Sequence, residues 1–280
     1  MKSNFWRRFC RNKGAVFGLI VLALVALLVA VGPWIAQFDP WDMVGMPFAS
    51  PLAAEGMLLG TDTMGRDILS GIVGGARVSL LIGVVSTVVS LLIGVSVGAI
   101  SGYFGGWVDA TLMRFTELFQ AIPSFALAIV LVAIFEPSVQ SIVAAIAVVS
   151  WPPVARLVRS EFLTLRQRDF VAAAQLAGQS TPRIILTQIL PNAASPIVVM
   201  ASLMVATAIL LESSLSFLGL GDPNQMSWGY MVGSARTVLR QAWWMAVFPG
   251  IAILLTVLAL NLVGEGLNDG LNARADGRSK

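Results

Sequence analysis

Histidine is absent from this chain of 280 residues, and cysteine occurs once, as Cys10. Histidine is the most common general base and transition-metal ligand of enzymes, so zinc hydrolysis, haem electron transfer and Ser/His proteolysis lack a necessary group. A single cysteine cannot form an internal disulfide or a Cys-x-x-Cys site. We therefore expect no catalytic residue and no metal site, and we do not expect an enzyme.

The phosphate-binding loop Gly-x-x-x-x-Gly-Lys-Ser/Thr is also missing. In that loop the backbone N–H groups surround the phosphates of ATP and the lysine reaches them. A transporter built on this chain and driven by ATP would therefore need its ATPase as a separate protein. We expect this chain itself to bind no cofactor.

Charge is scarce. Only 12% of the residues are charged, 57% are hydrophobic and the mean hydropathy is +0.83, whereas soluble domains carry about 25% charged residues. So little polar surface cannot coat a globule in water, but it suits an all-α integral membrane protein with lipid as its surroundings. The net charge of +3 does not indicate nucleic-acid binding, because basic residues in a membrane chain mostly record topology.

Six apolar runs have about the 20 residues that a bilayer needs. The first is longer than the apolar core of a signal peptide, about 7–15 residues, so we expect it to be retained. The third helix is expected to begin upstream, near Leu112, and Trp151, Pro152 and Pro153 are expected to break the inner part of the fourth. The predicted spans are 14–36, 78–103, 118–135, 137–155, 195–217 and 246–263.

Lysine and arginine set the orientation, because they gather in cytoplasmic segments. With both termini inside, fourteen of the 18 basic residues are cytoplasmic and four are outside; the opposite orientation reverses this ratio. The predicted organisation is a cytoplasmic N-terminal segment 1–13, a first span 14–36, an outside loop 37–77, a five-span core 78–272 that contains a cytoplasmic loop 161–192, and a cytoplasmic tail 273–280.

The loop 161–192 carries the clearest local pattern. Asp169 is a good helix N-cap, the alanines after it favour a helix, and Gly178 suits a left-handed helix end. Thr181 and Pro182 then restart the chain as a second helix. A helix of small residues is slim enough to lie in a cleft on another protein; the alternative is a loop that only connects two spans.

This loop resembles the EAA loop of importer permeases in the ABC transporter family, whose pattern is Glu-Ala-Ala, three residues, Gly, nine residues, Ile, one residue, Leu-Pro. Ala172 stands in place of the glutamate and Gln188 in place of the isoleucine. The matching residues are Ala173, Ala174, Gly178, Leu190 and Pro191.

Further motifs, in the same order and spacing, resemble the C-type subunits of dipeptide and oligopeptide permeases over about residues 5–272. They include Arg-Asn-Lys-Gly-Ala at 11–15, Leu-Gly-Thr-Asp at 59–62, Gly-Tyr-Phe-Gly-Gly at 102–106, Leu-Ser-Phe-Leu-Gly-Leu-Gly at 215–221 and Phe-Pro-Gly at 248–250.

The resemblance implies a type I ABC importer permease fold in a bacterial inner membrane. It implies three kinds of partner besides lipid: a homologous second permease, two ABC ATPases that hold ATP and Mg²⁺, and an extracytoplasmic substrate-binding protein. Proteins of this kind carry dipeptides, oligopeptides, nickel chelates, glutathione, opines or oligosaccharides. The residues implied in ATPase coupling are Asp169, Phe170, Ala172, Ala173, Ala174, Gly178, Leu190 and Pro191.

Two polar groups outside that loop are further candidates. Glu212, with Ser213 and Ser216, lies near the outer end of the fifth span, where a carboxylate is costly unless it faces water or a partner. It either lines the translocation path or contacts the second permease, or it reaches outside water.

The other group is Asp62, Arg66 and Asp67 in the first outside loop, where glycines at 60 and 65 allow tight turns. This cluster either stabilises the fold of the loop, with Arg66 paired to a carboxylate, or is a docking point for the binding protein or the second permease.

The main rival function is a secondary transporter driven by an ion gradient. Such proteins usually show paired inverted repeats and broken helices at mid-membrane, and the two halves of this sequence show neither a convincing repeat nor an acidic pair at mid-span. A membrane enzyme is less favoured, because the chain lacks histidine and clustered aspartate. A scaffold without transport is also less favoured.

Overall fold

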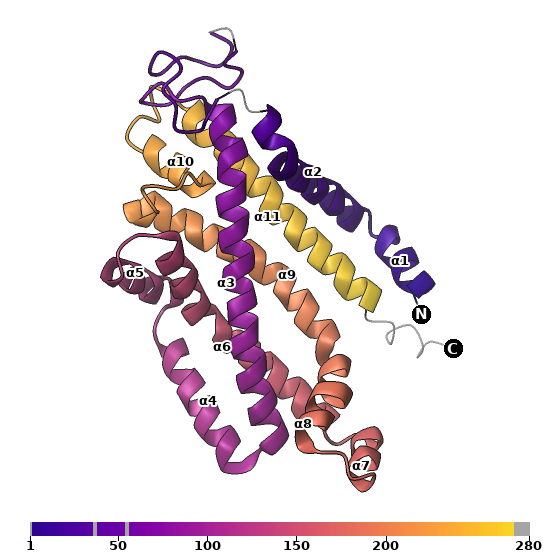
Figure 1. Ribbon diagram of the computed structural model, residues 1–280. Coiled ribbons are helices and arrows are strands. Elements are labelled where there is room, and N and C mark those ends of the chain that lie inside the picture. The colour runs from indigo at the N-terminus through magenta and orange to yellow at the C-terminus, as the bar shows by residue number, and fades with distance from the viewer. Residues whose placement is uncertain (1, 36–37, 54–55, 272–280) are drawn as a thin grey trace.

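The computed structural model describes residues 2–35, 38–53 and 56–271, and in these residues every regular element is a helix. The helices form an elongated bundle with residues 38–67 at one end and the short helices α7 and α8 at the opposite end (Figure 1). The elements are α1 (Lys2–Arg11), α2 (Lys13–Ile35), α3 (Ile68–Phe104), α4 (Gly106–Ala121), α5 (Ser124–Ile134), α6 (Val139–Leu165), α7 (Asp169–Leu176), α8 (Thr181–Arg183), π-helical η1 (Ile184–Ile189), α9 (Leu190–Leu215), π-helical η2 (Ser216–Leu220), α10 (Trp228–Ala235) and α11 (Trp244–Leu271).

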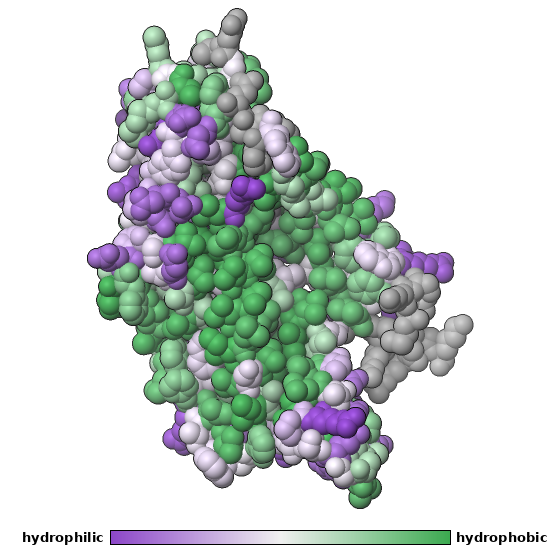
Figure 2. Space-filling model, viewed as in Figure 1, coloured by the Kyte–Doolittle hydropathy of each residue, from purple (hydrophilic) through white to green (hydrophobic). Residues whose placement is uncertain are grey.

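The helices confirm an all-α chain with about six spans. Five helical segments are long and apolar enough to cross a membrane, and α4 with α5 makes a sixth if that bent pair is one span. The face seen in Figure 2 is hydrophobic along its middle and hydrophilic toward both ends, which is the pattern of a bundle surrounded by lipid.

The first and last predicted spans correspond to α2 and α11, which pack side by side. Gly18 permits the close approach, because a Cβ there would lie 2.7 Å from the carbonyl oxygen of Ala259. Helix α11 begins at Trp244 and continues to Leu271, beyond the predicted range 246–263. The predicted tail 273–280 and residue 36 lie outside the described residues.

Helix α3 begins at Ile68, ten residues before the predicted start of the second span at Val78. Asp67 is its N-cap: one carboxylate oxygen accepts hydrogen bonds from the backbone N–H of Ser70 at 2.8 Å and from its hydroxyl at 2.7 Å. Residues 68–77 of the predicted outside segment 37–77 are therefore helical.

The predicted third span is broken. Helices α4 and α5 meet at an angle of 82°, and the break lies at Ile122, which is extended (φ −93°, ψ 131°), and Pro123. Proline disfavours helical geometry at the preceding residue and has no N–H to continue the ladder. Helix α4 also begins at Gly106, earlier than Leu112.

Pro152 and Pro153, by contrast, do not end a helix, and the prediction of a break in the fourth span was wrong. Helix α6 is continuous over both prolines. It lies against a glycine face of α3, where a Cβ at Gly94 would be 2.5 Å from Val154 Cβ and a Cβ at Gly98 would be 2.4 Å from Ala155 O. This close packing along α3 holds α6 in one piece and overrides the local sequence preference.

The predicted separation between a second loop helix and a fifth span at Ser195 was also wrong. The chain is helical from α8 through η1 and α9 into η2, where Gly219 (φ 87°) interrupts the helical geometry. In η1 the N–H of Leu190 donates to Ile185 O, a five-residue step typical of a π turn. Pro191 follows directly, in the first turn of α9, where its missing N–H costs little.

Candidate functional site at the α7 end

Helix α7 has the predicted position and end. Gly178 has φ +72°, the N–H of Gly178 donates to Gln175 O at 3.0 Å and that of Gln179 donates to Ala174 O at 3.1 Å. This left-handed glycine turn stops the helix. The N-caps differ by one residue from the prediction, because Arg168 and Ser180, instead of Asp169 and Thr181, occupy the extended cap positions; Asp169 is the acidic residue of the first turn, where the helix dipole favours it.

One face of α7 is fixed to the bundle. Val171 and Ala174 are 1% and 6% exposed and belong to a cluster with Phe162 of α6 and with Ile184 and Ile189 of η1. Val171 was not predicted as a site residue. Its signal is the i, i+3 spacing from Ala174, which places both on one helix face. Movement of α7 must therefore move the ends of α6 and η1 as well.

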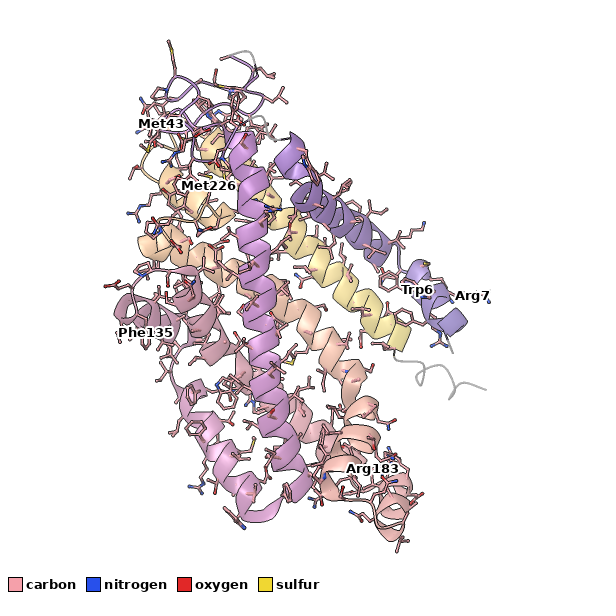
Figure 3. All side chains as sticks on the ribbon, in the orientation of Figure 1. Trp6, Arg7, Met43, Phe135, Arg183 and Met226 are labelled. Atoms are coloured by element: carbon pink, nitrogen blue, oxygen red, sulfur yellow. The ribbon has the colours of Figure 1, made fainter. Side chains whose placement is uncertain are left out.

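The other face of α7 is open. Ala172, Ala173 and Gly178 are exposed, Phe170 is 38% exposed, and Leu176 is 91% exposed. Sequence reasoning missed Leu176, although a leucine beside the glycine stop of a docking helix is a recognisable apolar contact point. In Figure 3, Arg183 is labelled at this end of the bundle, and Met43 and Met226 are labelled at the opposite end.

The eight predicted coupling residues thus divide into three groups. Ala174 is buried, and Leu190 is half-buried and packs against the same cluster, so both support the loop. Pro191 is exposed at the start of α9. Those on the exposed surface of the loop are Asp169, Phe170, Ala172, Ala173 and Gly178.

Glu212 lies inside the subunit, with 1% of its surface exposed. Its Oε1 accepts hydrogen bonds from the hydroxyls of Ser216 at 2.8 Å and Ser227 at 2.7 Å, and its Oε2 accepts from Ser213 at 3.4 Å. Of the two alternatives, the one in which the carboxylate reaches outside water does not fit this burial, because the serine hydroxyls take the place of water. Since Ser227 is also the N-cap of α10, accepting from the N–H of Tyr230, the carboxylate joins α9 to α10. A role in the translocation path stays a prediction.

Asp62, Arg66 and Asp67 form a folded turn at the opposite end. Asp62 Oδ1 accepts from the N–H of Arg66 at 2.9 Å, and the Arg66 guanidinium lies 3.9 Å from Asp62 Oδ2 and 4.6 Å from the ring centroid of Trp41. Gly65 has φ +78°. The three residues hold residues 38–67 to the start of α3; docking of a partner here stays a prediction.

The structure also brings together an ion pair that the sequence analysis did not single out. Arg159 of α6 donates to both carboxylate oxygens of Asp109 of α4. Sequence offers little signal for it, because fifty positions separate the two residues. In the described ranges, no group of three His, Cys, Asp or Glu residues has the arrangement of a metal site.

A helical bundle with about six apolar spans defines an integral membrane protein. Residues 94–277 match the family model described as binding-protein-dependent transport system inner membrane component, and residues 3–51 match that of the N-terminal transmembrane domain of oligopeptide transport permease C. The chain belongs to this family of ABC importer permeases, in its dipeptide and oligopeptide branch.

Named relatives cover nearly the whole chain. This chain is 42% identical over 277 residues to the di/tripeptide transport system permease protein DppC of Pseudomonas aeruginosa (strain UCBPP-PA14), and the match covers 97% of this chain and 91% of the relative. It is 44% identical to the dipeptide transport system permease protein DppC of Escherichia coli (strain K12), covering 97% and 92%. The oligopeptide permease protein OppC of Haemophilus influenzae (strain ATCC 51907 / DSM 11121 / KW20 / Rd) is 39% identical, covering 96% and 87%.

The fold has known relatives among solved structures. A chain of the MetNI methionine ABC transporter in an inward-facing conformation superposes with a TM-score of 0.60 at 17% identity, covering 70% of this chain and 93% of that chain. A chain of an amino acid ABC transporter superposes with a TM-score of 0.54 at 13% identity, covering 71% and 92%. The type I importer permease fold predicted from the sequence is thereby confirmed, and the chain is a translocation subunit and not an enzyme.

Proposed function

We propose that this chain is the permease subunit of an ATP-driven importer for short peptides in a bacterial inner membrane. The path is formed with a homologous second permease, an extracytoplasmic binding protein delivers the substrate, and two ABC ATPases supply the energy. Peptides are favoured because the relatives at 39–44% identity are named as dipeptide, tripeptide and oligopeptide permeases. This chain binds no cofactor, and ATP with Mg²⁺ is held by the ATPases.

The observation that carries the proposal is the two-sided construction of α7. Its inner face, Val171 and Ala174, is locked into the bundle, while Ala172, Ala173 and Leu176 project from it. Small side chains let a partner surface approach the helix backbone, and Leu176 supplies apolar area, at about 25 cal/mol per Å² buried. A helix that merely linked α6 to η1 would not need a 91%-exposed leucine at its tip.

The mechanism follows from that construction. With both termini cytoplasmic, α7 faces the ATPases and residues 38–67 face the binding protein. When ATP draws the two ATPases together, each carries its docked helix with it, and the bundle turns as a rigid body so that the path opens outward. Hydrolysis releases the ATPases and the path opens inward again.

The test is co-purification of the ATPases with this chain when the neighbouring genes are co-expressed. We expect both ATPases to stay bound to the native chain in detergent and to be lost from Ala173→Arg and Leu176→Asp. Both substitutions lie on the exposed face of α7, so the fold is retained. Met46→Arg, at an 82%-exposed site at the opposite end, is the control and should leave binding intact.

A native chain that binds no ATPase, and whose transport persists on an ion gradient alone, would overturn the proposal in favour of a secondary transporter. ATPases that remain bound to Leu176→Asp and to Ala173→Arg would leave the importer but remove α7 as the docking helix.

A further inference from the structure

Helices α3, α4 and α6 are tied together near the α7 end by one ion-paired cluster. Helix α4 follows α3 through Gly105 and Gly106, both with positive φ (+67° and +55°), so the chain reverses without a loop. In the first turn of α4, Asp109 receives two parallel hydrogen bonds from Arg159 of α6: Nε to Oδ1 at 2.5 Å and Nη2 to Oδ2 at 2.6 Å. The hydroxyl of Ser101, on α3, also donates to Oδ1.

The pair is more than a surface contact. The side chain of Asp109 is 16% exposed and that of Arg159 is 34% exposed. Exposed single ion pairs contribute about 0–1 kcal/mol, but a fork-to-fork arginine–carboxylate pair that is partly buried fixes both distance and angle between its helices. Such a contact makes α4 follow both a rotation and a translation of α6.

The same cluster leads directly to α7. Arg166, just after the end of α6, donates to the carbonyl oxygen of Tyr103 at 2.7 Å, and only residues 166–168 separate α6 from α7. Phe162 of α6 is fully buried in the cluster that holds Val171 of α7, and a Cβ at Gly102 would lie 2.6 Å from Phe162 Cβ. The end of α6 is consequently in tight contact with α7 on one side and with α3 on the other.

Helix α4 has a different continuation. It ends at Ala121, and the chain then turns by 82° into α5, so that α4 and α5 form a broken span. A bend at Ile122 and Pro123 is a place where a small displacement of α4 changes the direction of α5. Asp109 therefore lies between the end of α6 that leads to α7 and the bend between α4 and α5.

We infer that the Asp109–Arg159 pair transmits the movement of α7 to the broken span α4–α5, so that both are positioning residues for transport. The inference rests on the proposed function, because it takes α7 as the element that the ATPases move. It assigns to the pair a role in coupling and not in docking, since neither side chain belongs to the exposed face of α7.

The experiment uses the assembled transporter in proteoliposomes and measures three quantities: ATPase co-purification, the rate of ATP hydrolysis, and substrate transported per ATP hydrolysed. Asp109→Asn keeps the shape of the side chain and removes its charge; Arg159→Lys keeps the charge and loses the two-pronged geometry. Arg156→Gln, an exposed arginine one turn earlier on α6, is the control.

We expect Asp109→Asn to keep its ATPases and its melting temperature within a few degrees, while substrate transported per ATP falls about tenfold, the scale of one lost charge-assisted hydrogen bond. Arg159→Lys should lose less and Arg156→Gln nothing. Unchanged coupling in both Asp109→Asn and Arg159→Lys would overturn the inference. So would loss of folding or of ATPase binding in both, because the pair would then be structural only. Failure of the proposed function is distinct, since the native chain would then bind no ATPase.

Discussion

At the scale of single residues, the buried polar groups show how this chain solves the cost of polarity inside an apolar bundle. Glu212 is the clearest case, since three serine hydroxyls surround its carboxylate. A buried polar group is tolerated when its hydrogen bonds are made and is costly when they are not. The sequence identified Glu212 as unusual, but Ser227 is fifteen positions away, and only the path of the chain between α9 and α10 brings it into contact.

Removing this carboxylate should destabilise the contact between α9 and α10. We expect Glu212→Ala to lower the free energy of unfolding by roughly 1–3 kcal/mol, because the hydroxyls of Ser216 and Ser227 lose a buried acceptor. Glu212→Gln, which keeps one acceptor oxygen and nearly the same shape, should cost less. Thermal unfolding in detergent measures both, and a Glu212→Ala variant as stable as the native chain would contradict the assignment.

At the scale of helices, the sequence predicted the presence of the membrane-spanning helices better than it predicted where each helix begins and ends. Each of the six predicted spans overlaps a helix of the bundle, because long apolar runs are a direct requirement of the bilayer. The ends were not found where packing or capping decides them: Asp67 begins α3 early, and the glycine face of α3 keeps α6 whole across two prolines. Pro123 does break its span, so a proline alone does not reveal which outcome applies.

The contact between α3 and α6 gives a test of that explanation. Gly98→Ala places a Cβ 2.4 Å from Ala155 O and 2.8 Å from Val158 Cβ, so the helices must move apart, at a cost of about 1–3 kcal/mol. Gly250→Ala in α11 is the matched control, because a Cβ there meets nothing within 4 Å, and it should be neutral or stabilising by up to about 1 kcal/mol. Equal stability of the two variants in thermal unfolding would contradict the packing account.

At the scale of the whole molecule, the exposed face of α7 was largely predictable from the sequence, and the side-chain contacts between helices were not. Ala172, Ala173 and Gly178 stand in one short motif, so sequence spacing placed them. The Asp109–Arg159 pair links residues fifty positions apart, and nothing local in either segment indicates the partner. The proposal that the substrates are peptides rests on the named relatives.

The orientation of the bundle can be measured with the single cysteine. Cys10 is exposed near the N-terminus, on the same short helix as the labelled Trp6 and Arg7 (Figure 3). With the N-terminus cytoplasmic, a membrane-impermeant maleimide should label Cys10 only after the cells are opened. In a Cys10→Ser background, Met46→Cys should be labelled in intact cells. The reverse pattern would contradict the distribution of lysine and arginine.

The most direct test of the central claim is uptake of a labelled dipeptide into proteoliposomes that contain this chain, its second permease and the ATPases. The binding protein and the dipeptide are added outside the vesicles, and ATP is enclosed inside them. The account predicts that uptake requires both ATP and the binding protein. It also predicts that Leu176→Asp abolishes uptake and that Met46→Arg leaves it unchanged. Uptake that continues without ATP, or that Leu176→Asp leaves unchanged, would contradict it.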